Sequence, residues 1–279
     1  MLAKIRGIFA TALTKLLLDI GIGITQPSDL LARRFKLEKP VLAPPDFIIK
    51  DSSKRKYTVL VMGSPSTVNS VLKLLSERLP DIIIWRYMPN IYSVYKGKIM
   101  EDRGDGYIVN LGDSQGFLPG HNHRVGDEVI VTVTKPGYNT LPRLEEKIVI
   151  SGRYMRLINK ENKVFLSEHI WSSIKRKELT NLGFLVKPRG WGLRWRSSSM
   201  YAGFEELMNE ASRLNNSIKE LLEKIENANT PCRLIEGETL AEVLFTYRSL
   251  SKLDEIRSSV VATLPRHHYL KGINEKGSI

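Results

Sequence analysis

The first ninety residues alternate between two patterns of hydrophobic positions. Apolar side chains recur at helical spacing over residues 13–20 and again over residues 68–75. Residues 57–62 and 82–85 are instead short apolar runs of the kind that form buried strands. Alternating helices and strands favour an α/β or α+β domain, which we place at residues 1–90.

At residue 92 the pattern changes to short strands separated by glycine turns. The expected strands are residues 92–100, 106–111, 116–118, 128–133 and 145–150. Five short strands in so short a segment are typical of a small closed barrel. We therefore expect an OB-type barrel over residues 91–150, with an irregular meander as the alternative.

Mixed helix and strand patterns return after residue 151. A long amphipathic helix is predicted from residue 204 to 225, followed by a strand near 233–235 and a helix over 240–248. The third expected domain is thus an α/β domain over residues 151–279. Together the patterns predict an α+β protein in which an OB-type barrel is inserted in an α/β platform.

Composition adds a strong charge imbalance. The 279 residues contain 42 Lys and Arg against 30 Asp and Glu, a formal net charge of +12. A hydrophobic content of 42% excludes wholesale disorder. The positive charge indicates a polyanion-binding protein, and the alternative is a basic enzyme whose charge is spread evenly.

The single cysteine, Cys232, excludes an internal disulfide and a cysteine-rich zinc site, and it favours an intracellular, cytoplasmic protein. The most apolar stretch, residues 8–24, is interrupted by Lys15 and Asp19. It is therefore expected to be buried structure rather than a membrane span or signal peptide.

The most basic window of the chain is residues 171–200, with seven Lys and Arg against one glutamate. If residues 191–196 form a strand, alternation puts both of its arginines on one face. The serines at 197–199 are then expected to cap the long helix. Such a site offers guanidinium groups, hydroxyls and helix-start amides to an anion, and the alternative is an exposed strand before a capped helix. The candidate anion-binding residues are Arg194, Arg196, Ser197 and Ser198.

Aromatic and cationic residues also accumulate in the predicted barrel. Exposed rings stack on bases and cations pair with phosphates, which is the chemistry that single-stranded RNA requires. The alternative for each ring is a place in the barrel core. The candidate RNA-binding residues are Lys96, Lys98, Tyr107, Phe117 and Arg143.

Catalytic residues and a metal site are not apparent. His121 and His123 lack a third ligand, and His267-His268 is either a functional pair or a solvated turn. No phosphate-binding glycine loop, hydrolase triad motif or helix-turn-helix is recognisable, so neither a nucleotide-dependent enzyme nor a DNA-binding protein is favoured.

Taken in order, several segments resemble known RNA enzymes. Residues 92–119 (YSVYKGKIMEDRGDGYIVNLGDSQGFLP), with 125–133 and 148–157, are similar to the OB-type RNA-binding barrel of the ribonuclease E/G family. The opening RGIFATALTKLLLDIGIGITQ, WGLRWRSS at 191–198 and PRHHYLK at 265–271 resemble its archaeal, AU-rich-RNA-binding branch.

The resemblance implies a fold and a function. It implies an RNase-E-like platform around the barrel, binding of AU-rich single-stranded or looped RNA, and endoribonuclease activity in the maturation or degradation of precursor rRNA. The alternative is a non-catalytic RNA-binding or RNA chaperone module. Magnesium is the candidate cofactor, and self-association into a homo-oligomer is left open.

Individual residues also match the family pattern. Phe117 matches the base-stacking aromatic of the barrel, and Arg196 with Ser197 matches an Arg-Thr pair that senses a 5′-monophosphate. Ile108 stands where a second barrel aromatic is expected, with Tyr107 as its neighbour. The aspartates that hold magnesium in ribonuclease E belong to a later domain, which we expect this chain to lack, as a fragment or shortened member would.

Overall fold

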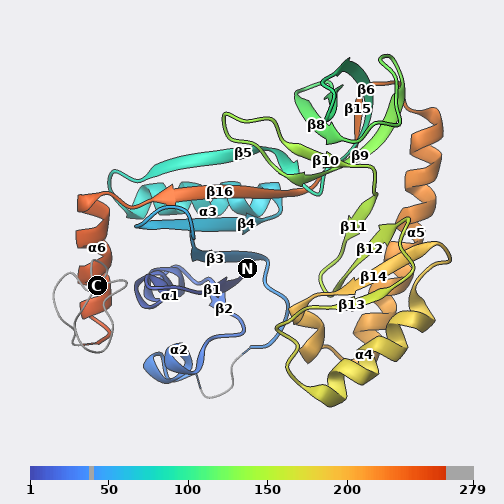
Figure 1. The fold of residues 1–279 in the computed structure, drawn as a ribbon. Coiled ribbons are helices and arrows are strands. Elements are labelled where there is room, and N and C mark those ends of the chain that lie inside the picture. Colours follow the sequence, from blue (N-terminus) through green and yellow to red (C-terminus); the bar gives the residue numbers. More distant parts are fainter. Residues whose placement is uncertain (38–40, 262–279) are drawn as a thin grey trace. The chain divides into compact units, whose positions relative to one another are not determined.

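A computed structural model describes residues 1–37 and 41–261 (Figure 1). The chain divides into two compact units. Unit 1 contains residues 1–86 and the segment from residue 239 onward, and unit 2 contains residues 87–238. Unit 2 is therefore inserted, in sequence, between the two parts of unit 1. The bounds of the three domains expected from the sequence stay a prediction.

Unit 1 is built on a mixed sheet with the strand order β2-β1-β3-β4-β16-β5. The strands are β1 (Leu2–Ile5), β2 (Gly23–Ile24), β3 (Phe47–Asp51), β4 (Thr58–Gly63), β5 (Ile83–Ile91) and β16 (Glu238–Leu244). The helices are α1 (Ala10–Leu18), α2 (Asp29–Arg34), α3 (Pro65–Arg78) and α6 (Tyr247–Ser258). Buried apolar side chains from the sheet and from these helices form one core, so the helical spacing recognised in the sequence is confirmed for α1 and α3.

The helix expected over residues 240–248 is wrong. Residues 238–244 form strand β16, which pairs antiparallel with β4 from Thr239 opposite Gly63 to Leu244 opposite Thr58. Only the last part of the expected helix, from Tyr247, belongs to α6. The apolar run at 240–245 suits either structure, and its pairing with a strand about 180 residues earlier decides the outcome.

Unit 2 begins with a closed barrel of five strands, which confirms the expected OB-type barrel and the α+β fold class. The strands are β6 (Val94–Asp102), β7 (Gly106–Asn110), β8 (Gln115–Pro119), β9 (Glu128–Lys135) and β10 (Arg143–Glu145). A further strand, β15 (Cys232–Ile235), pairs with the first half of β6. The segment expected as one strand at 145–150 is divided, because β10 ends at Glu145 and β11 belongs to the next sheet.

That second sheet of unit 2 has the order β11-β12-β14-β13. Its strands are β11 (Val149–Ser151), β12 (Met155–Asn159), β13 (Val164–Leu166) and β14 (Trp191–Trp195). The helical elements are α4 (Ser173–Val186), the 3₁₀ helix η1 (Ser197–Tyr201) and α5 (Phe204–Asn227), the long helix predicted from the sequence. One face of the sheet and the apolar stripe of α5 share a core in which Leu193 and Trp195 are fully buried. We call this sheet the arginine sheet, for the residues on its other face.

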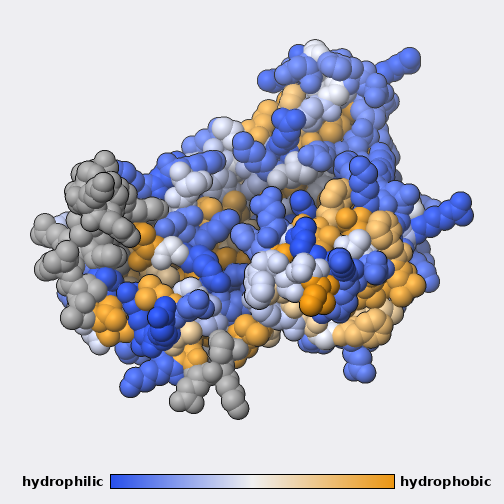
Figure 2. Space-filling model, turned by 60° about the horizontal axis from the view of Figure 1, so that its bottom comes forward, coloured by the Kyte–Doolittle hydropathy of each residue, from blue (hydrophilic) through white to orange (hydrophobic). Residues whose placement is uncertain are grey.

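Helix α4 leaves apolar side chains on the surface. Ile174 and Leu185 are 79% and 74% exposed, and Trp171, just before the helix, is 77% exposed. On the face shown in Figure 2, exposed hydrophobic residues (orange) are interspersed with hydrophilic residues (blue). No helix in the described ranges is long and apolar enough to cross a membrane.

Candidate nucleic-acid interface

The outer wall of the barrel carries Phe117 between two neighbours on adjacent strands. Phe117 lies opposite Ile108 on β7 and opposite Arg143 on β10. Its strand neighbours Gly116 and Leu118 have the inward phase, so the Phe117 ring is on the outside, where it is half-buried. Arg143 is exposed. The sheet register thus places an aromatic ring and a cation side by side on the barrel surface.

Tyr107 lies on the other side of the barrel wall. It is 1% exposed, belongs to the barrel core, and its hydroxyl accepts the backbone N–H of His123 at 3.0 Å. Side chains alternate along a strand, so Ile108 lies on the face of β7 opposite to Tyr107, although it is itself buried. A ring in this position offers no free face to a base. Of the two candidate rings that the sequence indicated, Phe117 remains the candidate for stacking.

The two candidate lysines of β6 differ in their surroundings. The Lys96 ammonium donates to the carbonyls of Ile225 and Ala228 at 3.3 and 3.0 Å, at the C-terminus of α5, and lies 3.4 Å from a carboxylate oxygen of Glu128. A cation in this place satisfies helix-end carbonyls and stabilises the negative end of the helix dipole. Lys98 is exposed and therefore accessible to a phosphate.

The sequence missed a further cation beside Phe117. Lys135 is exposed and is the register partner of Arg143 across a β-bulge. The outer row therefore has two neighbouring cations next to the aromatic ring. The bulge hides this placement from a simple alternation pattern, because it shifts the phase of β9 by one residue.

On the arginine sheet, one row of register partners crosses all four strands. The row consists of Ser151, Arg156, Arg194 and Phe165. Arg194 is exposed, and its guanidinium carbon lies 5.9 Å from the centre of the Phe165 ring. Arg196 follows two residues later, with the same phase. The face opposite the helices therefore holds three arginines, one more than the sequence analysis recognised.

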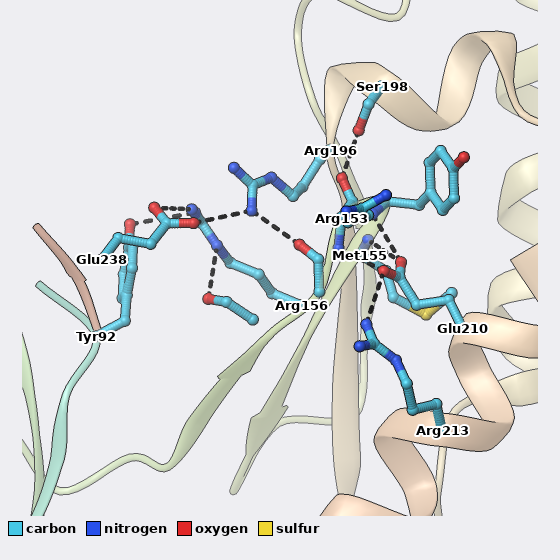
Figure 3. A network of polar contacts seen from close by, with 12 residues as sticks. Tyr92, Arg153, Met155, Arg156, Arg196, Ser198, Glu210, Arg213 and Glu238 are labelled. Carbon is cyan, nitrogen blue, oxygen red and sulfur yellow. Dashed lines mark hydrogen bonds and ion pairs between the residues drawn. The ribbon is translucent and has the colours of Figure 1, made fainter. Parts of the chain in front are cut away.

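The third arginine, Arg156, is held by an aromatic ring and a carboxylate (Figure 3). Its guanidinium lies 4.2 Å from the centre of the Tyr92 ring and donates to the Tyr92 hydroxyl at 3.2 Å. Its Nη2 lies 3.6 Å from Oε2 of Glu238, and Arg196 Nη1 donates to Oε1 of the same carboxylate at 3.1 Å. Burial, and then the neighbouring charge of Arg196, lower the pKa of the Arg156 guanidinium. Glu238 thus bridges two guanidinium groups.

The serines after β14 do not cap the long helix as expected. They form the 3₁₀ helix η1, in which the Ser198 hydroxyl donates to the carbonyl of Arg153 at 2.6 Å. Helix α5 begins after Gly203, whose N–H donates to Glu206 at 2.9 Å. That hydrogen bond, and then the Tyr154 hydroxyl, lower the pKa of Glu206. The chain turns at Ala202 before the helix starts, so the serines lie too early to act as its cap.

Glu210 of α5 holds the turn between β11 and β12. Its carboxylate accepts the N–H groups of Arg153, Tyr154 and Met155, the last two at 2.6 and 3.1 Å. The same turn offers the Gly152 carbonyl to Arg196 Nη1 at 2.8 Å. Glu210 therefore fixes the segment against which the arginine and serine side chains are positioned (Figure 3). In the sequence it is one of several glutamates on the long helix, and nothing there distinguishes it.

Comparison with known proteins shows which family this chain is similar to. Residues 149–266 match the model of the Ribonuclease E/G family. The protein named "Probable ribonuclease FAU-1" from Pyrococcus horikoshii is 38% identical over 278 aligned residues, which cover 96% of this chain and 57% of that protein. Its namesake from Hyperthermus butylicus is 35% identical and covers 97% of this chain and 58% of its own length. The chain is therefore similar to the ribonuclease E/G family, whose model it matches over residues 149–266. It spans less than three fifths of the length of these relatives.

The family match contains the entire arginine sheet, together with Glu210 and Glu238. Arg156 was absent from the sequence candidates, although it follows Tyr154 and Met155 in a stretch with strand alternation. What identifies Arg156 is the pairing of β12 with β14 in the structure, which sets Arg156 opposite Arg194. The recognition roles of these residues stay predictions.

The described histidine candidates, His121 and His123, belong to no metal-binding cluster. His123 Nε2 lies 3.0 Å from Glu146, and His267-His268 lie outside the described residues. In the described part of the chain, no group of three or more His, Cys, Asp or Glu side chains is arranged to hold a metal ion. The described residues therefore do not fit the magnesium centre that the family implies, and no chemical step is assigned to one.

Proposed function

We propose that this chain is the RNA-binding part of an endoribonuclease of the ribonuclease E/G type. Its proposed substrates are single-stranded or looped, AU-rich RNAs, including precursor rRNA that it helps to mature or degrade in the cytoplasm. The match of residues 149–266 to the family and the relatives named as probable ribonucleases support this proposal. The net charge of +12 supports a polyanionic partner.

One observation carries the proposal, namely the row on the outer wall of the barrel. Phe117 lies between Ile108 and Arg143, with Lys135 next in register and Lys98 exposed on β6. A base stacks on an aromatic face in any sequence context, and adjacent cations follow the phosphate backbone. Duplex DNA offers no unstacked base to such a ring, so single-stranded RNA is the better partner.

The arginine sheet supplies the second part of the proposed site, for a 5′-monophosphate. Arg194 is exposed, whereas Arg196 is engaged with Glu238 and the Gly152 carbonyl. Guanidinium groups bind phosphate oxygens through charge-assisted hydrogen bonds. We assign Arg194 and Arg196 to the terminal phosphate, with the Ser197 and Ser198 segment beside it.

Binding is tested by salt titration with labelled RNA. The chain should prefer AU-rich single-stranded RNA to duplex DNA of the same length, and its affinity should fall steeply as salt rises. Equal affinity for both, or a flat salt response, contradicts the proposed RNA surface.

Activity is tested by incubating the protein with a 3′-labelled, 5′-monophosphorylated precursor rRNA, with and without magnesium. Endonucleolytic products that depend on the protein support the ribonuclease. Tight, salt-dependent binding without products supports the alternative, a non-catalytic RNA-binding or chaperone module. The same substrate with a 5′-hydroxyl shows whether a 5′-monophosphate is recognised.

A further inference from the structure

The arginine sheet contains more positive charge than its surroundings neutralise. Arg156 and Arg194 are direct register partners, and Arg196 lies on the same face. Like charges opposite one another across two strands are destabilising. Among the described contacts, the carboxylate of Glu238 is the acidic group that meets this cluster, at 3.1 Å from Arg196 and 3.6 Å from Arg156. Two of the three guanidinium groups, those of Arg156 and Arg196, therefore share one carboxylate.

The contact between Glu238 and the cluster is incomplete. Oε2 of Glu238 is buried and has no hydrogen-bond partner within the described ranges, and Arg156 Nη2 is too distant for a hydrogen bond. The Glu238 side chain is 19% exposed, and the Arg156 and Arg196 side chains are 16% and 23% exposed. A buried oxygen that lacks a partner is costly. An anion with more oxygens and more charge would satisfy the three arginines better than this carboxylate does.

We propose that Glu238 is a specificity-determining residue that competes with the RNA terminus for the Arg156–Arg196 pair and is displaced by a terminal phosphomonoester. This inference rests on the proposed 5′-phosphate site and adds two residues to it. Arg156 becomes a direct phosphate ligand, with its guanidinium plane supported by the Tyr92 ring. Glu238 is the internal anion that occupies the pair until the terminus arrives.

Charge explains why such a competitor selects a terminus. A phosphomonoester carries a charge of about −1.5 to −2 at neutral pH, whereas an internal phosphodiester carries a single charge. A carboxylate also carries a single charge, so it competes on equal terms with a diester and is outmatched by a monoester. Glu238 thereby keeps internal backbone phosphates away from the arginine pair and yields to a 5′-monophosphate.

The test removes the charge of Glu238 and measures a gain. Glu238→Gln should bind a 5′-monophosphorylated oligoribonucleotide about tenfold more tightly than wild type, since one charge-assisted hydrogen bond no longer competes. Uridine 5′-monophosphate should likewise bind more tightly to the variant, and uridine should not. Arg156→Gln should weaken binding of the same two phosphorylated probes. If Glu238 had only a structural role, its replacement would damage the fold and lower the affinity for these probes. A higher affinity of the Glu238→Gln variant therefore indicates that Glu238 competes with the phosphate.

The matched control is Glu236→Gln, which removes the same charge two residues away. Glu236 pairs with Arg233 at 2.8 Å rather than with the sheet arginines, so its variant should leave the affinity for both phosphorylated probes unchanged. An equal gain in both variants shows only a general charge effect and overturns the proposal. Unchanged or weaker binding by Glu238→Gln, in protein whose melting temperature is retained, also overturns it.

A second variant covers a loss of folding. If Glu238→Gln melts before the assay temperature, Glu238→Asp retains the charge on a shorter side chain, and a gain for uridine 5′-monophosphate is expected there as well. No gain in that variant counts against competition. The mononucleotide assay does not depend on RNA binding by the barrel. Failure of RNA binding with an intact mononucleotide gain therefore refutes the proposed RNA surface of the barrel and leaves the 5′-phosphate site and this inference standing.

Discussion

Replacement of Glu210 should destabilise the turn at residues 153–155, which supports the arginine sheet, and should cost more unfolding free energy than replacement of an exposed glutamate on the same helix. The Glu210 side chain is 5% exposed, and its two oxygens accept three backbone N–H groups from residues 153–155. Glu210→Ala leaves these donors without an acceptor. Arg153 is exposed and its N–H is readily hydrated, whereas Tyr154 and Met155 are buried.

The magnitude follows from the two buried donors. Each unsatisfied buried N–H costs about 1–3 kcal/mol, and relief from burying the carboxylate charge offsets part of the sum. We expect Glu210→Ala to lower the free energy of unfolding of unit 2 by about 3 kcal/mol. Glu210→Gln retains one acceptor oxygen and should cost about half as much.

The assay is urea unfolding, followed by the fluorescence of tryptophans that include the buried Trp195. Glu220→Ala on the same helix is the control, because Glu220 is exposed and its loss should change stability by less than about 0.5 kcal/mol. Equal unfolding free energies for Glu210→Ala and Glu220→Ala would refute the role assigned to the turn. So would a Gln variant that is less stable than the Ala variant.

Three further predictions concern the barrel and the helix start. Phe117→Ala should weaken RNA binding by about 1–3 kcal/mol without unfolding the barrel, whereas Tyr107→Ala should melt the barrel, as circular dichroism would show. If the Phe117→Ala variant is unfolded, Phe117 belongs to the core, and if the Tyr107→Ala variant is folded, the Tyr107 ring is not needed there; either result contradicts the placement given above. Lys98→Met should reduce the salt slope of RNA binding by about 0.7, and Lys96→Met should instead lower stability by about 1 kcal/mol with an unchanged slope. The lowered pKa of Glu206 means that it stabilises the fold above its ordinary pKa of 4.5, an effect lost as the pH falls through the folded-state value. Urea unfolding at several pH values should therefore show a stability difference between wild type and Glu206→Gln that is largest near neutral pH and disappears in acid.

The local sequence was sufficient to predict those helices and strands whose hydrophobic pattern fits only one type of secondary structure. The glycine turns and short alternating runs predicted the barrel, and the apolar stripe of α5 predicted a helix that the structure confirms. The alternation of residues 191–196 also predicted that Arg194 and Arg196 share one face, and in the structure Leu193 and Trp195 are buried on the other face. Each of these patterns is set by the nearest neighbours in the chain.

Features that depend on distant pairing were missed. Residues 238–244 suit a helix or a strand, and β4 decides for the strand. The outward side of β7 was unknown, so Tyr107 could not be separated from Ile108 until the register with β8 was visible. Arg156 and Glu238 are 82 residues apart in sequence, and no local pattern indicates that they meet. The sequence therefore indicated Arg194 and Arg196 of the candidate site, but it did not indicate Glu238, which contacts Arg196.

Two carboxylates act on the same strand in opposite ways. Glu210 is enclosed, because its oxygens accept backbone N–H groups at the start of β12 and also contact Arg213, so it cannot leave without unfolding the turn. Glu238 contacts Arg156, further along β12, with a longer and partly unsatisfied contact, and its side chain is 19% exposed. The first carboxylate fixes the position of the strand, and the second holds a place that a stronger anion can take. In such a phosphate site the backbone that carries the arginines is held rigidly by Glu210, while the anion bound to the arginines can be exchanged. Recognition of an RNA terminus requires both properties.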